Sequence, residues 1–402
     1  MERRGTEHSA AESAIGYLYQ CYLPLLLLAE RASREPELTL TLELLDDVQF
    51  DEHGSAKELI QTKHRLQSRG DLSDTSVDLW RTINVWISVL EELGAEETPA
   101  LTLITTGVAP EASAASYLRE DEGRDPERAQ RALLRASTSS TNRTTAPWRT
   151  RFSRLSSNRR RQLVDAIKVA DGSLTIGEID ERLKMALYWA LPSTERADAF
   201  MEHVKGWWFG IAVRLLRREF RALAATDMLH AIQDVRDQFG PENLPRDPDL
   251  PDPDEFAVAG FQSRVFVRQL ELIAATQEQL ALAIRDYYRA FTQRSRWLRR
   301  DLLGVDEIDR FEARLVDEWR FVFTNLTAEL AGDAEEPEKQ RHGREIFARA
   351  AETARARIRE RYDESFMTRG SFHGLADDRR VGWHPDFEAR LEALLSPVVE
   401  ST

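Results

Sequence analysis

Acidic residues and a Gln-x-Lys sequence lie close together within the first 65 residues of the 402-residue chain. Glu43, Asp46 and Asp47 stand at the end of one expected strand, and Gln61 and Lys63 stand on the next. Residues two apart on a strand project from the same face, so Gln61 and Lys63 are expected to act together. Carboxylate and amide oxygens can hold Mg²⁺ or Mn²⁺, and a lysine can orient an attacking water and offset charge on a phosphate. The spacing therefore favours a metal-dependent phosphodiesterase site.

The same residues also suit an ordinary solvated hairpin. Acids and lysines on exposed strands commonly form cross-strand pairs, each worth about 0.2 to 1 kcal/mol. Alternation does not decide between Asp46 and Asp47 as the metal ligand, because a shift of one residue turns a side chain to the other face.

The segments around these residues predict a small α/β sandwich. Alternating or β-prone residues bounded by turn residues predict strands, expected at Leu38–Leu44, Val48–Phe50, Glu58–Lys63 and Ala100–Gly107. Apolar residues at helical spacing predict an amphipathic helix over 72–93. The apolar segment Gly16–Ala29 is interrupted by Gln20 and Pro24 and is too short to span a membrane, so we expect a buried first helix.

Between about residue 110 and the far C-terminus the sequence shows no convincing strand and reads mainly as helices. Five prolines among aspartates over 240–254 favour an extended spacer, because proline cannot propagate a helix. Three helices are expected after it: one extended helix over 267–291, then 305–330 and 338–364. The expected organisation is an α/β domain over 1–130, a helical domain over 131–239, a linker over 240–255 and a helical domain over 256–402.

Composition excludes several classes of protein. Lys and Arg number 55 and Asp and Glu number 69, so the net charge is 55 − 69 = −14. A chain this acidic cannot bind nucleic acid by bulk charge and would need local basic patches. The single cysteine, Cys21, excludes a disulfide framework and a cysteine-based zinc cage, and a reducing cytoplasm is the natural location.

One arginine-rich segment is a candidate phosphate-binding patch, because Trp148 and Phe152 lie among its arginines. In an acidic chain, such arginines also commonly pair with neighbouring acids. The candidate DNA-contacting residues are Arg149, Arg151, Arg154, Arg159, Arg160 and Arg161.

The segment from Arg369 to Phe387 is unusually dense in glycine, aromatic residues and histidine. A metal site there would use His373 and His384 with Asp377 or Asp386, but the spacing matches no zinc pattern. A tight, packed turn is the ordinary structural interpretation of these residues.

The order of the N-terminal segments resembles the PD-(D/E)xK nucleases, and in particular the Mrr-like branch with Gln-x-Lys. Over roughly residues 10–110 it is similar to double-stranded DNA endonuclease domains of bacterial antiphage systems. The resemblance implies a restriction-endonuclease-like sandwich that cuts DNA with Mg²⁺ or Mn²⁺. It makes Asp47 or Asp46 the metal-binding acid, Gln61 the second ligand, Lys63 the water-orienting lysine and Glu43 an auxiliary ligand. Gln20 stands where related enzymes often carry a glutamate.

The C-terminal segment resembles the terminal part of C-terminal domains in prokaryotic ABC-three component conflict systems. This resemblance implies an ABC-type ATPase and a small middle component as partners, with His373, Trp383 and His384 on a docking or sensing surface. The combined expectation is an antiphage endonuclease effector with a helical docking region, acting as a homo-oligomer and without a membrane segment. The alternative is a non-catalytic adaptor of the ATPase complex.

Overall fold

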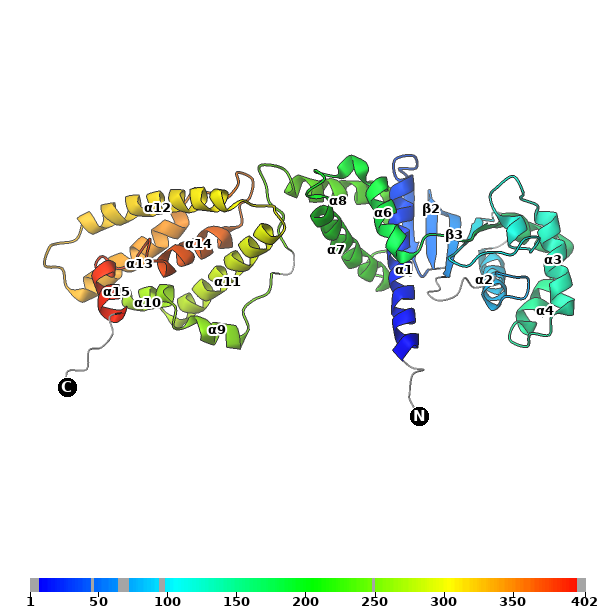
Figure 1. The fold of residues 1–402 in the computed structure, drawn as a ribbon, viewed down its shortest axis with the longest axis horizontal. Coiled ribbons are helices and arrows are strands. Elements are labelled where there is room, and N and C mark those ends of the chain that lie inside the picture. The colour runs from blue at the N-terminus through cyan, green and yellow to red at the C-terminus, as the bar shows by residue number, and fades with distance from the viewer. Residues whose placement is uncertain (1–6, 45–46, 64–71, 94–97, 248–249, 396–402) are drawn as a thin grey trace. The chain divides into compact units, whose positions relative to one another are not determined.

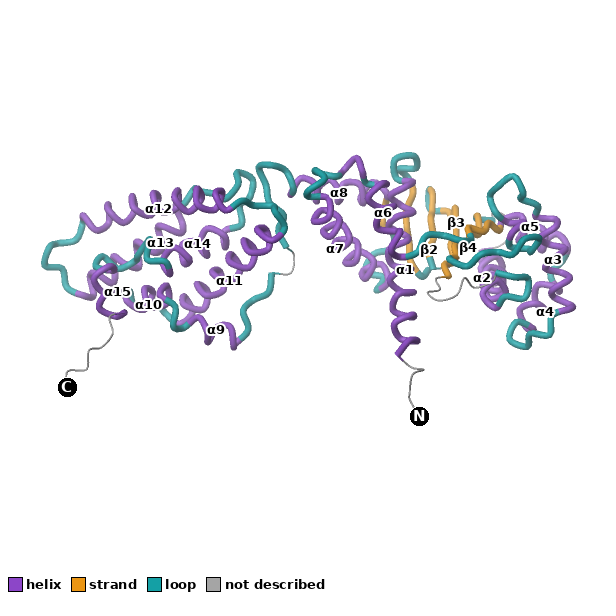
Figure 2. The backbone as a smooth tube through the Cα atoms, in the orientation of Figure 1, coloured by secondary structure: helices purple, strands orange, loops and turns teal. Residues whose placement is uncertain are grey.

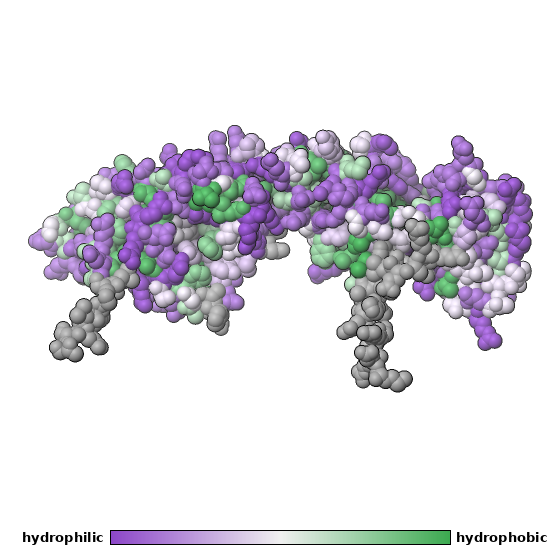
Figure 3. All heavy atoms as spheres, viewed as in Figure 1, coloured by the Kyte–Doolittle hydropathy of each residue, from purple (hydrophilic) through white to green (hydrophobic). Residues whose placement is uncertain are grey.

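The structure is a computed structural model that describes residues 7–44, 47–63, 72–93, 98–247 and 250–395. The chain divides into two compact units, each shown in Figure 1. Unit 1 comprises residues 1–191 and 200–234, and unit 2 comprises residues 192–199 and 235–402. The visible face of each unit is mainly hydrophilic, with smaller hydrophobic areas between (Figure 3).

Unit 1 is built on a six-stranded mixed sheet with the order β5-β4-β3-β2-β1-β6. The strands are β1 (Leu38–Leu42), β2 (Val48–Glu52), β3 (Ser55–Lys63), β4 (Ala100–Thr105), β5 (Ile167–Ala170) and β6 (Leu223–Ala224). β1, β2 and β3 form an antiparallel meander, whereas β3, β4 and β5 run parallel. The carboxyl ends of β3, β4 and β5 therefore meet at one edge of the sheet.

The four strands expected from alternation are present, but the prediction of no strand beyond about residue 110 is wrong. β5 has four residues and β6 has two. Strands this short carry no readable alternation, and each forms only by pairing with a strand distant in the sequence. β6, for example, pairs with β1 through Leu40 and Leu223.

Helices flank the sheet of unit 1 (Figure 2). They are α1 (Glu7–Arg31), α2 (Val77–Leu93), α3 (Pro126–Ser139), α4 (Ala146–Arg154), α5 (Ser157–Ala166), α6 (Ile176–Ala186), α7 (Ala197–Leu216) and α8 (Ala225–Gln238), with the short helices η1 (Ser116–Leu118) and η2 (Tyr188–Ala190). A hydrophobic cluster joins β3 to β5 with α2 to α5 and includes Trp80, Trp86, Leu103 and Phe152. This core fixes the parallel part of the sheet.

The first helix is confirmed and is longer than the apolar segment that predicted it. Leu23, Leu25 and Leu28 in α1 are at most 2% exposed, whereas Tyr17 is 74% exposed. The helix therefore buries its second half. Among the described residues, no helix combines the length and apolar character needed to cross a bilayer.

Unit 2 is helical. Its helices are α9 (Glu255–Phe261), α10 (Val265–Leu272), α11 (Gln277–Arg299), α12 (Val305–Ala328), α13 (Glu336–Thr353), α14 (Ser365–Asp377) and α15 (Phe387–Leu395). α11 and α14 pack closely because Gly370 lies at their contact. A Cβ atom at that position would lie 2.2 Å from the Asp286 carbonyl oxygen, so no larger residue fits.

The extended helix predicted over 267–291 is wrong: the structure has two helices, α10 and α11. Ala274 adopts a left-handed conformation with φ 54°, which ends the first helix. Thr276 then caps the second helix, because its hydroxyl accepts the Gln279 N–H and the Gln279 side chain accepts the Thr276 N–H. The helical spacing of apolar residues continues across this break, so the sequence pattern does not reveal where the first helix ends.

The proline-rich segment forms no helix or strand in its described residues, as expected, but part of it is packed. Leu244 is 2% exposed, and the Pro245 carbonyl accepts a hydrogen bond from Trp297 Nε1 over 2.8 Å. Asp247 forms ion pairs with Arg296 at 2.9 Å and Arg300 at 3.5 Å. Residues 244–247 therefore belong to the fold of unit 2.

Candidate functional site

The Gln-x-Lys pair lies at the carboxyl end of β3. Lys63 Nζ donates a hydrogen bond to Gln61 Oε1 over 3.0 Å, so the two side chains share a face, as alternation predicts. Gln61 is 6% exposed and Lys63 is half-buried. The parallel register places Lys63 beside Thr105, at the end of β4. The pair thus lies at the edge where the parallel strands end.

Asp47 is anchored by donors from two elements. Its Oδ2 accepts hydrogen bonds from the Thr62 N–H at 2.9 Å, from Thr62 Oγ1 at 3.0 Å and from Gln20 Nε2 at 3.2 Å. Thr62 is the central residue of the Gln-x-Lys sequence, so its side chain leaves the opposite face of the strand. The first helix and β3 therefore both position the Asp47 carboxylate.

Glu43 lies in the same electrostatic neighbourhood. Its N–H donates to the Asp47 carbonyl over 3.2 Å, and its φ of 51° marks a sharp turn after β1. Loss of hydration raises the pKa of Glu43, and the negative charge of Asp47 raises it further, while Lys63 acts in the opposite direction. Glu43 thus interacts with both Asp47 and Lys63 at this strand end, while the Thr62 side chain that bonds Asp47 leaves the face of β3 opposite to Gln61 and Lys63. Asp46, the alternative metal ligand, lies outside the described residues.

The oxygen atoms gathered here are few for a metal centre. The described residues contain no group of three or more His, Cys, Asp or Glu side chains that could hold a metal ion. A cation at this site would therefore need the Gln61 amide oxygen and water beside the acidic ligands. Mg²⁺ commonly keeps several waters, so this donor set suits it.

Glu58, on the same strand, has a structural role. Its carboxylate accepts hydrogen bonds from Arg31 Nη1 and from Thr102 Oγ1, each at 2.5 Å. These bonds tie α1 to β3 and β4. The sequence pattern did not predict that Arg31 would bond Glu58 or that Thr62 would bond Asp47, because both contacts depend on how α1 and the strands pack together.

The arginine-rich segment does not act as one exposed patch. Arg149 is 5% exposed, and its guanidinium donates to Thr145 Oγ1 and to the carbonyls of Ala136, Ser137 and Asn142. Bonded in this way, the Arg149 guanidinium closes the turn between α3 and α4. It cannot face a phosphate backbone without unpacking that turn.

Two further arginines of this segment are also engaged within unit 1. Arg151 donates to Asn84, to Ser88 and to Glu91, the last at 2.6 Å. Arg160 donates to the Leu155 carbonyl at 2.6 Å and to other carbonyls of the turn after α4. The remaining candidates, Arg154, Arg159 and Arg161, are exposed.

The three residues expected on a docking surface are buried. His373, Trp383 and His384 are 2%, 1% and 0% exposed. Residues without exposed surface cannot touch a partner directly, so their part in docking would have to be indirect. The interpretation as a packed turn fits residues 378–386 only, because Arg369 to Asp377 lie in α14. In that turn a Cβ atom on Gly382 would lie 2.0 Å from the Phe387 ring, and the Gly382 carbonyl accepts from Trp319 Nε1 at 2.8 Å.

Burial gives His373 a measurable effect on stability. The ring lies among Phe266, Phe347 and Arg369, and loss of hydration, aided by the Arg369 charge, lowers its pKa from 6.5 to about 3. Between these values the unfolded chain binds a proton that the folded chain does not, so stability falls as the pH falls. We expect this group to cost unit 2 about 2 kcal/mol between pH 7 and pH 5. His373→Phe should remove that loss in urea unfolding at the two pH values.

The described histidines of unit 2, His342, His373 and His384, are all buried, so the control is the exposed His230 of unit 1. His230→Phe should leave the pH dependence of unit 2 as in the wild type. An unchanged pH dependence in His373→Phe would contradict the assignment of a neutral, buried imidazole.

One comparison with known proteins bears on unit 2. Residues 266–391 match the family model of C-terminal domain 7 of the ABC-three component (ABC-3C) systems. The match runs from α10 into α15, and it indicates a component of an ABC-three component system. No curated protein and no solved structure matches the chain significantly.

Proposed function

We propose that the protein is the endonuclease effector of an ABC-three component antiphage system, with unit 1 cutting double-stranded DNA. The observation that carries this proposal is the group of residues at the end of β3, where Lys63 bonds Gln61 and Glu43 interacts with both Asp47 and Lys63. The mixed sheet flanked by helices supports a restriction-endonuclease-like fold for this unit.

A divalent cation is the proposed cofactor. Glu43, Asp47 and Gln61 supply oxygen atoms of the kind that Mg²⁺ and Mn²⁺ prefer, and the mutual repulsion of the two carboxylates would be relieved by a cation. When bound, the metal would supply Lewis-acid activation of water and charge neutralisation on phosphate.

The other steps of the proposed reaction depend on side chains of unit 1. Lys63 would orient the attacking water and stabilise negative charge developing on the phosphate. Thr62 and Gln20 would keep the Asp47 carboxylate fixed, so that no reorganisation is needed during reaction. Arg154, Arg159 and Arg161 are the arginines of the predicted patch that remain exposed for a DNA backbone.

Unit 2 would connect this nuclease to its system. The family match supports an ABC-type ATPase and a middle component as partners in a cytoplasmic defence complex. Two cuts in a duplex usually require two active sites, so a homo-oligomer belongs to the same proposal.

The test is metal-dependent cleavage of plasmid DNA in the presence of the partner proteins. We expect cleavage with Mg²⁺ or Mn²⁺ and none with EDTA. Asp47→Asn should reduce cleavage more than 100-fold and weaken Mn²⁺ binding in calorimetry, because it removes a charged ligand. Glu52→Gln is the matched control, because Glu52 is a β2 carboxylate that pairs with Lys57. Plasmid that stays equally intact with and without metal, with partners and phage trigger supplied, would refute the nuclease.

The alternative is a non-catalytic adaptor of the ATPase complex. It is favoured by the position of the family match, which lies within unit 2 and leaves the nuclease-like unit uncovered. The adaptor predicts complex formation with the ATPase and middle component that Asp47→Asn leaves unchanged, together with no DNA cleavage under any condition.

A further inference from the structure

An open cleft of about 770 Å³ lies on unit 2 between α12 and the chain that joins α13 to α14. Four arginines and three acidic residues line it together with Ala356 and Ile358. The charged lining residues are Arg314, Asp317, Glu318, Arg355, Arg357, Arg359 and Glu360. Neither the family match nor the proposed nuclease assigns a role to this cleft.

In the segment that joins α13 to α14, buried apolar residues alternate with exposed arginines. Ala356 and Ile358 are 8% and 6% exposed. Arg355, which precedes Ala356, and Arg357, which lies between the two apolar residues, are exposed. The chain is extended here, so successive side chains leave opposite sides. Burial of the two apolar residues therefore holds two guanidinium groups at the rim of the cleft.

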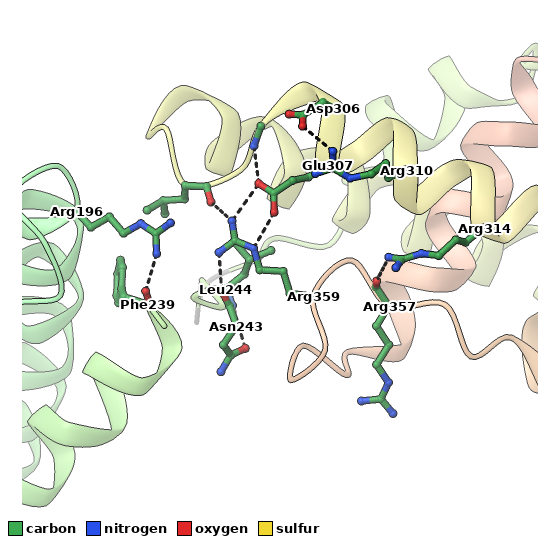
Figure 4. Close-up of polar contacts among 12 residues, drawn as sticks. Arg196, Phe239, Asn243, Leu244, Asp306, Glu307, Arg310, Arg314, Arg357 and Arg359 are labelled. Atoms are coloured by element: carbon green, nitrogen blue, oxygen red, sulfur yellow. Dashed lines mark hydrogen bonds and ion pairs between the residues drawn. The ribbon is translucent and has the colours of Figure 1, made fainter. Parts of the chain in front are cut away.

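Hydrogen bonds fix this wall to α12. The Glu318 carboxylate accepts the N–H groups of Arg355 and Ala356, each at 3.0 Å, and Arg314 Nη2 donates to the Arg357 carbonyl at 2.6 Å. Arg359 anchors the far end, as Figure 4 shows, through Glu307 and nearby carbonyls. The cleft is thus formed before any partner arrives, which reduces the entropy lost on binding.

The arginines keep donors for an incoming anion. A guanidinium has five N–H donors, and the bond from Arg314 Nη2 to the Arg357 carbonyl occupies a single nitrogen. Arg357 pairs with Asp363 at 3.9 Å, a long contact, and the Arg357 side chain is 49% exposed. In Figure 4 the Arg357 guanidinium points away from Arg314 and from the Arg359 cluster.

We propose that this cleft docks an extended acidic segment of a partner protein, whose carboxylates pair with Arg314, Arg355 and Arg357. Arginine recognises carboxylates through paired hydrogen bonds, so three arginines around one cleft suit a segment with spaced acidic residues. Asp317 and Glu360 interrupt the positive lining, so a segment with spaced carboxylates can avoid them, whereas a phosphate backbone carries a negative charge on every nucleotide. None of the nine lining residues is aromatic, so the cleft offers no platform for base stacking.

The experiment measures binding of a fluorescein-labelled peptide of alternating glutamate and glycine to the full chain by fluorescence anisotropy. The cleft variant is Arg355→Gln with Arg357→Gln. The control is Arg268→Gln with Arg341→Gln, two exposed arginines that pair with acids three residues away on α10 and α13. Both double variants change the net charge equally, and circular dichroism verifies that both are folded.

We expect the peptide to bind the wild type and the control equally, and the cleft variant at least tenfold more weakly. Equal loss in both double variants would overturn the proposal, because it would show attraction by overall charge alone. A short DNA duplex that displaces the peptide and loses affinity in the cleft variant would also overturn it, in favour of a phosphate-binding cleft. Neither outcome depends on whether unit 1 cuts DNA.

Discussion

Replacing Lys63 with methionine is expected to lower the rate of DNA cleavage by about 10²- to 10³-fold, a typical effect of removing one group that stabilises transition-state charge. Methionine retains an unbranched stem, so the half-buried position stays filled while the charge and the bond to Gln61 Oε1 are lost. Single-turnover cleavage of plasmid with Mg²⁺ and the partner proteins measures the effect. Mn²⁺ binding should persist, since Lys63 is not a ligand.

The matched control lies on the same strand. Lys57 pairs with Glu35 at 2.8 Å and Glu52 at 3.2 Å, away from the strand end. Lys57→Met should cleave at the wild-type rate. If Lys63→Met also cleaves at that rate, the lysine has no part in the reaction and the proposed role of the Gln-x-Lys sequence fails.

The local parts of the N-terminal unit were predictable because their signals are local. Alternation over Leu38–Leu42 predicts the strand, although Thr41 on the other face is also buried, and helical spacing over Val77–Leu93 predicts the buried face of α2. β5 and β6 escaped prediction because short edge strands exist only through partners far along the chain. The break at Ala274 escaped it because an alanine with positive φ leaves no trace in a pattern of apolar residues.

The candidate residues divide in the same way. The shared face of Gln61 and Lys63 followed from their spacing, and the structure confirms it. Whether an arginine or a histidine faces solvent depends on tertiary packing instead. Arg149 lies under a turn between two helices, and His373 lies against aromatic rings of α10 and α13. Neither the arginine-rich pattern nor the family resemblance could predict this burial.

Replacing Arg359 with methionine is expected to destabilise unit 2 by about 1 to 3 kcal/mol, because partly buried acceptors lose their hydrogen-bond donor. The Arg359 side chain is 8% exposed and donates to Glu307 Oε1 at 3.1 Å, to the Asn243 carbonyl at 2.9 Å and to the Leu302 carbonyl at 2.7 Å. These acceptors come from the proline-rich segment, the turn before α12 and α12 itself (Figure 4). Methionine would leave all of them without this donor. Urea unfolding followed by tryptophan fluorescence measures the loss.

Glu307 provides the second half of this test. Burial acts to raise its pKa, but hydrogen bonds from Arg359 and from the Gly304 N–H outweigh burial and hold the pKa below its usual value. A lowered carboxyl pKa contributes stability above the pKa of the unfolded chain and loses it as the pH falls through the folded value. Arg359→Met should therefore flatten the acid side of the stability profile, and adding Glu307→Gln should cost less than the sum of the two single changes. The control is Arg361→Met, because Arg361 is exposed. An equal loss of stability in that variant would contradict the role of Arg359 in joining the proline-rich segment, the turn before α12 and α12. It would show instead that this segment tolerates no substitution.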